Sequence, residues 1–294
     1  MNCSATPHPS GARTRRQLLE GGARIVAAVA WMVIAAGLCT SARAGAPIAA
    51  AAAGAGAQTS SELDDAAARM QYAYYTEDAQ SLQEVLRLTA DLAVGPVLEP
   101  AKAYQLAYGY WKLAQLHARS LTSEPAQPGA KPQASQAAQS CARYARQAIA
   151  ADGALGEAYA IQAACEGYSP DARRSTASAS EDCARSRSLR KALSLAPGSP
   201  RVRLIEALCT SQQHNDPAAL ERWRTVVTQF EASPPSRPGM PDWGHVEALT
   251  TLGSLYLQRG DPIAARDVLE RALVLVPDHR EAQKLLRTAS ARPH

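Results

Sequence analysis

The chain has 294 residues, of which 46% are apolar, 20% are charged and only 5% are aromatic, and its formal net charge is +4. This composition can bury a core, so it excludes a chain that is disordered throughout. The shortage of aromatic residues disfavours a β-sandwich or a β-barrel, and we therefore expect close-packed helices.

The first 44 residues have the features of an export signal. Four arginines precede an apolar stretch at 25–39, which is too short for a membrane span, and small residues lead up to Ala44 and Gly45. We predict a signal peptide over 1–44, cleaved near Ala44/Gly45, and a periplasmic or secreted protein. The general secretory and twin-arginine routes both stay open. The alternative is an uncleaved segment that anchors the protein in the inner membrane, facing the periplasm.

Cleavage would change the charge of the chain. Residues 1–44 hold five of the 31 Lys and Arg residues and one of the 27 Asp and Glu residues, which leaves 26 of each sign. A protein that binds nucleic acid needs a basic face to neutralise phosphates. We therefore expect no nucleic-acid partner, and we expect membrane contact only if the N-terminal segment is not cleaved.

The rest of the chain has a helical pattern. Residues 45–60 are rich in Ala and Gly, and we expect a flexible tether there. From residue 61 onward apolar residues recur with helical spacing, which predicts an α-solenoid over 61–294. Breaks rich in Pro, Gly and Ser indicate loops at 121–136, 168–180 and 232–242. The expected helices cover roughly 62–77, 79–93, 99–120, 137–152, 154–167, 181–196, 200–213, 217–232, 243–259 and 262–275, and a closing helix covers 278–289.

The clearest internal repeat lies at 246–279. Small residues at 253 and 265 suit the point where two paired helices cross most closely, and a proline at 277 prevents the second helix from continuing. The signature positions hold Leu249, Leu252, Gly253, Tyr256, Ala265, Leu269, Ala272 and Pro277. This spacing resembles the tetratricopeptide repeat (TPR), a pair of helices of about 34 residues.

The resemblance implies an all-α, TPR-like helix-turn-helix solenoid, a right-handed superhelix whose concave groove binds a protein or peptide partner. In the last repeat the groove positions would be Glu247, Thr250, Ser254, Leu257 and Gln258. The alternative is that these are ordinary solvated positions of an amphipathic helix. Residues 192–286, with Pro-Asp-Trp-Gly at 241–244, also resemble exported bacterial TPR proteins of unassigned function.

The cysteines after residue 44 are even in number, as expected of disulfides in an oxidising compartment. They are Cys141, Cys165, Cys183 and Cys209. The first two are equidistant from Gly153 and the last two from Ala196, so each pair could meet across a helical hairpin. A bridge between Cys165 and Cys183, or four reduced buried thiols, are the alternatives. A zinc site is disfavoured because no C-x-x-C spacing occurs.

The sequence offers little enzyme chemistry. The histidines show no H-E-x-x-H spacing, and the S-x-x-K pattern at 188–191 lies inside a repeat helix with no K-T-G after it. We therefore predict a non-catalytic scaffold without a metal or cofactor. Two other functions remain open: a thiol redox or metal-handling periplasmic protein that uses the four cysteines, and a membrane-tethered envelope assembly factor.

Overall fold

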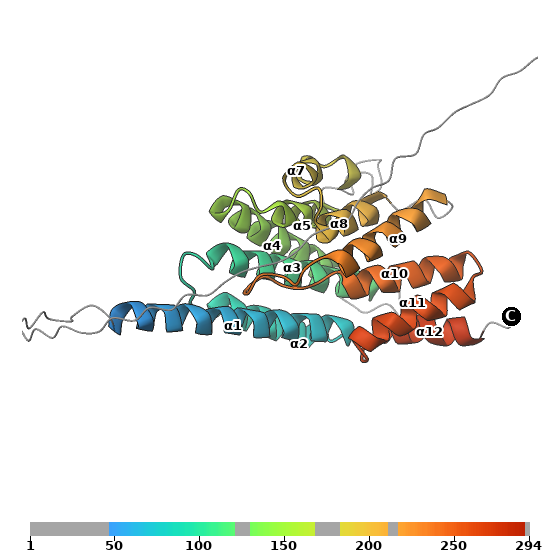
Figure 1. The fold of residues 1–294 in the computed structure, drawn as a ribbon, viewed down its shortest axis with the longest axis horizontal. Coiled ribbons are helices and arrows are strands. Elements are labelled where there is room, and N and C mark those ends of the chain that lie inside the picture. The colour runs from blue at the N-terminus through green and yellow to red at the C-terminus, as the bar shows by residue number, and fades with distance from the viewer. Residues whose placement is uncertain (1–46, 121–129, 168–182, 211–216, 292–294) are drawn as a thin grey trace, which may run out of the picture. The chain divides into compact units, whose positions relative to one another are not determined.

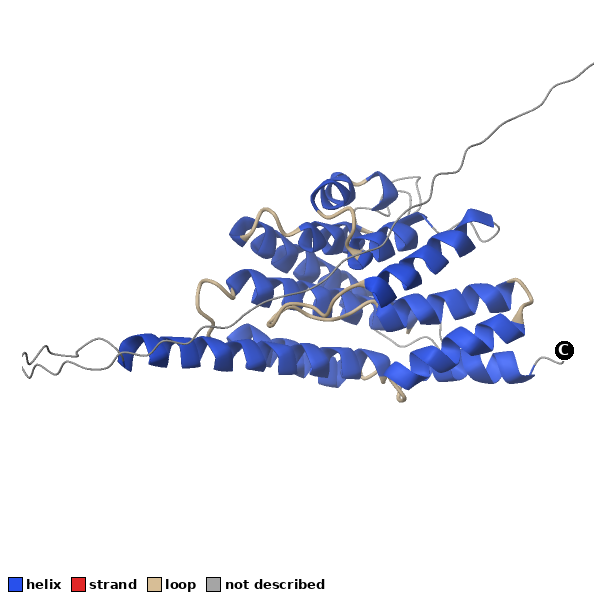
Figure 2. Ribbon diagram, in the orientation of Figure 1, coloured by secondary structure: helices blue, strands red, loops and turns tan. Residues whose placement is uncertain are grey.

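The computed structural model describes residues 47–120, 130–167, 183–210 and 217–291. The chain divides into 1–44 and a compact unit, Gly45–His294, and the description below concerns the second of these. Within the described residues every regular element is helical, as Figure 2 shows, so the all-α prediction is confirmed.

Figure 1 shows the helices in chain order. Their bounds are α1 Pro47–Tyr75, α2 Ala79–Asp91, α3 Glu99–Arg119, α4 Ala130–Ala151, α5 Gly156–Glu166, α7 Arg187–Leu195, α8 Pro200–Thr210, α9 Pro217–Ala232, α10 His245–Gln258, α11 Pro262–Leu275 and α12 Arg280–Ala291. Residues 183–185 form a further helical turn just before α7.

Successive helices pack as pairs, and the first helices of most neighbouring pairs also pack against each other. The pairs are α1 with α2, α3 with α4, α5 with α7, α8 with α9, and α10 with α11. Across pairs, α1 contacts α3, α3 contacts α5, α5 contacts α8, and α12 contacts α10. This pattern of neighbours is the one that stacked helix-turn-helix repeats produce.

Local capping fixes where several helices begin. The carboxylate of Asp78 accepts a hydrogen bond from the backbone N–H of Ser81 at the start of α2, and Asp261 does the same for Ala264 in α11. At α7 the Ser186 hydroxyl plays this role. These side chains satisfy backbone donors that have no partner inside the helix, which stabilises its first turn.

Two helices begin earlier than the sequence pattern predicted. We expected a tether over 45–60, whereas α1 already begins at Pro47. We expected a loop over 121–136, whereas α4 begins at Ala130; residues 121–129 lie outside the described residues. Alanine is the strongest helix former, and adding residues to an existing helix is easier than starting one. Pro132 is tolerated because it stands in the first turn of α4, where its missing N–H costs no hydrogen bond.

The last helical pair owes its close packing to a glycine. A Cβ atom added to Gly253 in α10 would lie 2.6 Å from Cγ of Leu269 in α11. The repeat positions Ala265, Leu269 and Ala272 are fully buried on the facing helix. These two helices can cross at this distance only because residue 253 is a glycine and has no side chain.

Substituting Gly253 by Ala is expected to lower the free energy of unfolding by about 1–3 kcal/mol, because the added methyl overpacks the contact with Leu269. A thermal or urea melt measures the loss. Gly198→Ala is the matched control, since a Cβ there would have nothing within 4 Å. Equal stability of the two variants would show that the crossing of α10 and α11 is loose.

Candidate functional site

The first helices of the pairs face one another around a buried charge. Lys112 in α3 forms an ion pair with Glu247 in α10, with 3.0 Å between Nζ and Oε1, and the two side chains are 2% and 11% exposed. The other carboxylate oxygen of Glu247 accepts hydrogen bonds from the hydroxyl of Tyr75, at 2.9 Å, and from the backbone N–H of Gly244, at 3.0 Å. This carboxylate therefore links α1, α3 and the start of α10.

Aromatic rings surround the ammonium group of Lys112. Its Nζ lies 4.1 Å from the ring centroid of Trp111, 4.4 Å from Tyr74, 5.4 Å from Tyr108 and 5.8 Å from Trp243. Such contacts are electrostatically favourable, because the face of an aromatic ring is negative. We call these rings, the ion pair and Tyr75 the Lys112 cluster.

Burial and charge act together on the titrating groups of the cluster. Burial lowers the pKa of Lys112, and the neighbouring carboxylate offsets this only in part. For Glu247 burial by itself would raise the pKa, but the ammonium of Lys112 and the hydrogen bonds that the carboxylate accepts outweigh it and lower the pKa. Burial raises the pKa of Tyr75 well above its ordinary value.

The predicted groove residues of α10 differ in exposure. Thr250 and Leu257 are buried, and the Thr250 hydroxyl donates to the backbone carbonyl of Val246. Ser254 is partly exposed and Gln258 is exposed. Glu247 is occupied by its partners inside the protein. Three of the five side chains are therefore not free at the surface, and in the case of Glu247 this is because Lys112 of α3 and Tyr75 of α1 reach across to it. Whether any of the five binds a partner stays a prediction.

A cavity of about 210 Å³ remains beside the Lys112 cluster. One wall is apolar and comes from α3, α8 and α9, with Trp111, Leu204, Leu208 and Trp223. The rest of the lining is mostly polar and comes from α10, from the remainder of α3 and from the start of α12: Glu247, Thr250, Thr251, Ser254, Lys112, Gln115, Arg119, His279 and Glu281. The cavity thus joins an apolar surface to hydroxyl groups, which is the composition expected of a site for one side chain of a ligand.

Polar contacts at the rim join the first helices to the last. Arg119 at the end of α3 pairs with Glu281 in α12, with 2.7 Å between nitrogen and oxygen. The rings of Tyr75 and His279 are in tilted contact, with their centroids 4.8 Å apart. Together with the bond from Tyr75 to Glu247, these contacts connect residues that are far apart in the sequence.

The segment at 233–244 packs against the helices. Its amino-acid composition alone does not show whether it lies against them or extends away from them. The backbone N–H of Gly239 donates to Asp64 in α1, and its carbonyl accepts from the buried Gln105 in α3 at 2.6 Å. Arg201 in α8 donates to the carbonyl of Trp243 and pairs with Asp242. The segment is therefore bonded to three helices.

Sequence reasoning missed Lys112. It occurs inside the apolar run of α3, with buried neighbours at 111, 113 and 114. A lysine in such a run is the signal that could have been used, because a buried ammonium requires a charged or aromatic partner. Its partner Glu247 could not be identified, since the two residues are separated by more than a hundred positions.

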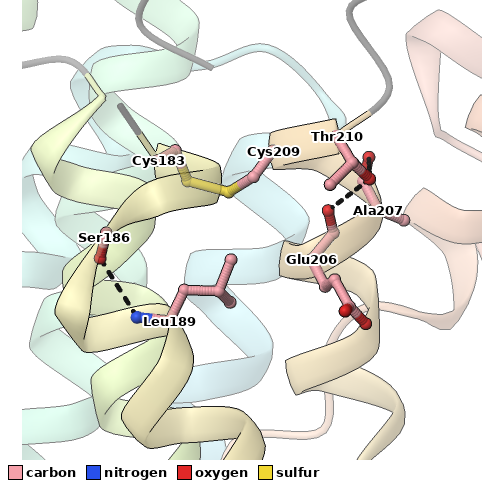
Figure 3. Close-up of a disulfide and its surroundings, with 7 residues drawn as sticks. All are labelled: Cys183, Ser186, Leu189, Glu206, Ala207, Cys209 and Thr210. Atoms are coloured by element: carbon pink, nitrogen blue, oxygen red, sulfur yellow. Dashed lines mark hydrogen bonds between the residues drawn. A yellow bond between two sulfur atoms is a disulfide. The ribbon is translucent and has the colours of Figure 1, made fainter. Parts of the chain in front are cut away.

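The four cysteines after residue 44 form two disulfides. Cys141 in α4 is bonded to Cys165 in α5, with their Cα atoms 6.0 Å apart, and Cys183 is bonded to Cys209 in α8, with 5.4 Å between Cα atoms. Each bridge closes a helical hairpin, which is the first of the arrangements considered from the sequence. Figure 3 shows the second bridge beside the start of α7. All four side chains are buried, so a reactive thiol is not presented to solvent.

The other candidate motifs do not come together. In the S-x-x-K pattern the Ser188 hydroxyl donates to Glu166, at 3.1 Å, while Lys191 is exposed. Among the described residues, no group of three or more His, Cys, Asp or Glu side chains could hold a metal ion.

No helix of the described part combines the length and the apolar character that crossing a membrane requires. The apolar stretch at 25–39 and the cleavage site lie outside the described residues.

The fold and the stacked pairs place the chain among the all-α helical-repeat proteins. The family model of the tetratricopeptide repeat matches residues 246–286. The matched segment comprises α10, α11 and α12, and it contains the repeat that the sequence signature predicted. A search of the curated proteins gives no match.

Three solved structures illustrate the similarity. A thermophilic TPR protein of Thermus thermophilus has 15% identity and a TM-score of 0.42, covering 67% of this chain and 100% of that one. YrrB, a TPR protein with an unusual peptide-binding site, has 16% identity and a TM-score of 0.33, covering 72% and 93%. Acl4, an assembly chaperone of RpL4, has 18% identity and a TM-score of 0.35, covering 72% and 66%.

Proposed function

We propose that the protein is an exported, non-catalytic scaffold that binds a protein or peptide partner. The observation that carries the proposal is the cavity beside the Lys112 cluster, which is lined both by the rings of Trp111 and Trp223 and by polar side chains of α10. Aromatic rings and hydroxyl groups around a preformed space suit an inserted side chain of a partner. A site that exists before binding also keeps the ordering cost of association small.

Export and a periplasmic location are part of the same proposal. They are supported by the arginine-rich, apolar and small-residue pattern over 1–44. Two disulfides in the helical unit are consistent with an oxidising compartment. A membrane-tethered assembly factor remains the second form of the proposal, and mass spectrometry of the native N-terminus distinguishes a start at Gly45 from a retained segment.

The thiol redox or metal-handling function has less support. Its four cysteines are bonded in pairs and buried, and a reductant has to reach a sulfur atom to react with it.

A single exposed change at the cavity tests the scaffold proposal. Ser254→Arg is expected to abolish capture of a partner in a crosslinking pull-down from native cells that express the full chain, because the long cationic side chain fills the cavity. Gln258→Arg is the matched control: it adds the same charge one turn further along α10, at an exposed position outside the cavity. A substitution of Glu247 would not serve, since its carboxylate holds the fold together.

The captured partner is then purified and its dissociation constant is measured against the two variants. A loss of at least tenfold for Ser254→Arg and less than about twofold for Gln258→Arg supports the proposal. Equal binding by both variants would exclude the cavity as the partner's site.

A further inference from the structure

Helix α7 carries a row of positive charge on its outer face. Arg187, Arg190 and Lys191 are all exposed, and their spacing of three and four residues puts them on one side of the helix. The helix contains no acidic residue. We call these three side chains the basic stripe.

The charges of the basic stripe are not neutralised by neighbouring carboxylates of the described residues. Within the described part of the chain, none of its three side chains forms an ion pair, and Arg190 donates only to the backbone carbonyl of Arg185. Other exposed or partly exposed arginines do pair with carboxylates: Arg69, Arg87, Arg203, Arg224 and Arg271. In the described residues, exposed cations without an ion pair also occur on α4 and α12. On the helix packed against α7, the carboxylate of Glu166 accepts hydrogen bonds from Ser188 and Gln162.

The opposite face of α7 is fixed to the protein. Leu189 and Ala192 are buried, and the Ser186 hydroxyl caps the first turn. The bridge from Cys183 to Cys209 fixes the chain just before the helix (Figure 3). The apolar face of α7 is therefore not available to enter a bilayer, and a partner of the outer face would be held through charge alone.

We propose that the basic stripe docks the protein onto an anionic phospholipid surface through the phosphates of the headgroups. Guanidinium and ammonium groups are the side chains that bind phosphate. The stripe offers no apolar or aromatic residue between its cations, and the core of a protein interface would need one. A layer of lipid headgroups needs no apolar residue between the cations, because it is bound through its phosphates. In Figure 1, α7 lies at the edge of the helical unit, next to α5.

The strength of this contact follows from the number of charges. Each Lys or Arg close to an anionic bilayer raises the partition coefficient about fivefold at moderate ionic strength. Three such residues correspond to roughly a hundredfold. The contact is reversible and weakens with salt, because the screening length falls as ionic strength rises.

The test measures binding of the full chain to phosphatidylcholine vesicles with and without phosphatidylglycerol, at low and high NaCl. Replacing Arg187, Arg190 and Lys191 by Gln is expected to lower the partition to phosphatidylglycerol vesicles by roughly a hundredfold at low salt. The matched control replaces Arg69, Arg87 and Arg224 by Gln, which removes the same charge from ion-paired positions elsewhere. It is expected to change the partition less than about threefold.

Residues 1–44 are themselves basic and partly apolar, so their binding is measured with a peptide of these residues and subtracted from the partition coefficient of every variant. An equal loss in the stripe and control variants would overturn the proposal, as would a wild type without preference for phosphatidylglycerol.

Poly-glutamate is the second probe. If it binds in a stripe-dependent way while vesicles do not, the surface serves an acidic protein and the lipid proposal is wrong. Neither result bears on the cavity beside Ser254, so the scaffold proposal is tested separately.

Discussion

Replacing Lys112 by Met is expected to lower the free energy of unfolding by about 3–5 kcal/mol, because the change leaves the carboxylate of Glu247 buried without its counter-ion. Methionine fills nearly the same volume, so the loss reports the charge and not a cavity. A urea melt with a linear extrapolation measures it. The exposed pair of Arg87 with Glu84 is the control, and Arg87→Met is expected to cost less than about 1 kcal/mol.

The double variant Lys112→Met/Glu247→Gln separates the two sources of the loss. Removing both charges together takes away the uncompensated carboxylate, so the double variant is expected to be more stable than Lys112→Met alone. If it is less stable by the sum of the two single losses, the pair is not coupled and the ion pair does not organise the cluster.

The same pair determines how the protein responds to acid. The pKa of Glu247 lies below its ordinary value of 4.5, since Lys112 and the Tyr75 hydroxyl outweigh the effect of burial. The stability that this group contributes is therefore complete above pH 4.5 and is lost as the pH falls through its lowered folded-state pKa. Unfolding curves of the wild type should show this loss, and the double variant should lack that part of it.

Removing either disulfide is expected to cost about 3.5 kcal/mol, because an open chain gains conformational entropy when it unfolds. The two bridges close segments of similar length, with sequence separations of 24 and 26, so the expected losses are nearly equal. Substituting Ala for both members of a pair avoids a leftover thiol and a buried hydroxyl. Thermal melts of Cys141→Ala/Cys165→Ala and of Cys183→Ala/Cys209→Ala measure the two losses.

A variant with all four cysteines replaced provides the control for these melts. Dithiothreitol is expected to lower the melting temperature of the wild type after unfolding and refolding, and to leave this variant unchanged. A wild type whose melting temperature is insensitive to reduction would contradict a stabilising role for the bridges.

The repetitive part of the molecule could be predicted from the sequence because it rests on local rules. The spacing of Leu249, Gly253 and Tyr256 predicts a helix with one small residue at a crossing, and the structure places Gly253 against Leu269. The symmetric positions of the cysteines about two turns led to the arrangement that the structure contains. These inferences need only residues within one or two helices.

The site could not be predicted in the same way, because it depends on residues that are distant in the sequence. The resemblance implied an open groove along α10, and that expectation assumed that α1 and α3 stay away from it. Lys112 and Tyr75 instead reach Glu247 from those helices. The spacing of apolar residues does not indicate how far one helical pair curves towards another. The exposure of the groove positions could therefore be determined only from the structure.

The contacts between the first and the last helices have a consequence for how the chain folds. In an open array of repeats each unit is stabilised by its neighbours alone, so unfolding can begin at either end and spread. Here Tyr75 meets Glu247 and His279, and Arg119 meets Glu281. These pairings join segments of high sequence separation, which slows folding. The N-terminal helices therefore acquire these partners only after α10 and the start of α12 have been synthesised, and opening of either of those helices removes contacts from α1 or α3.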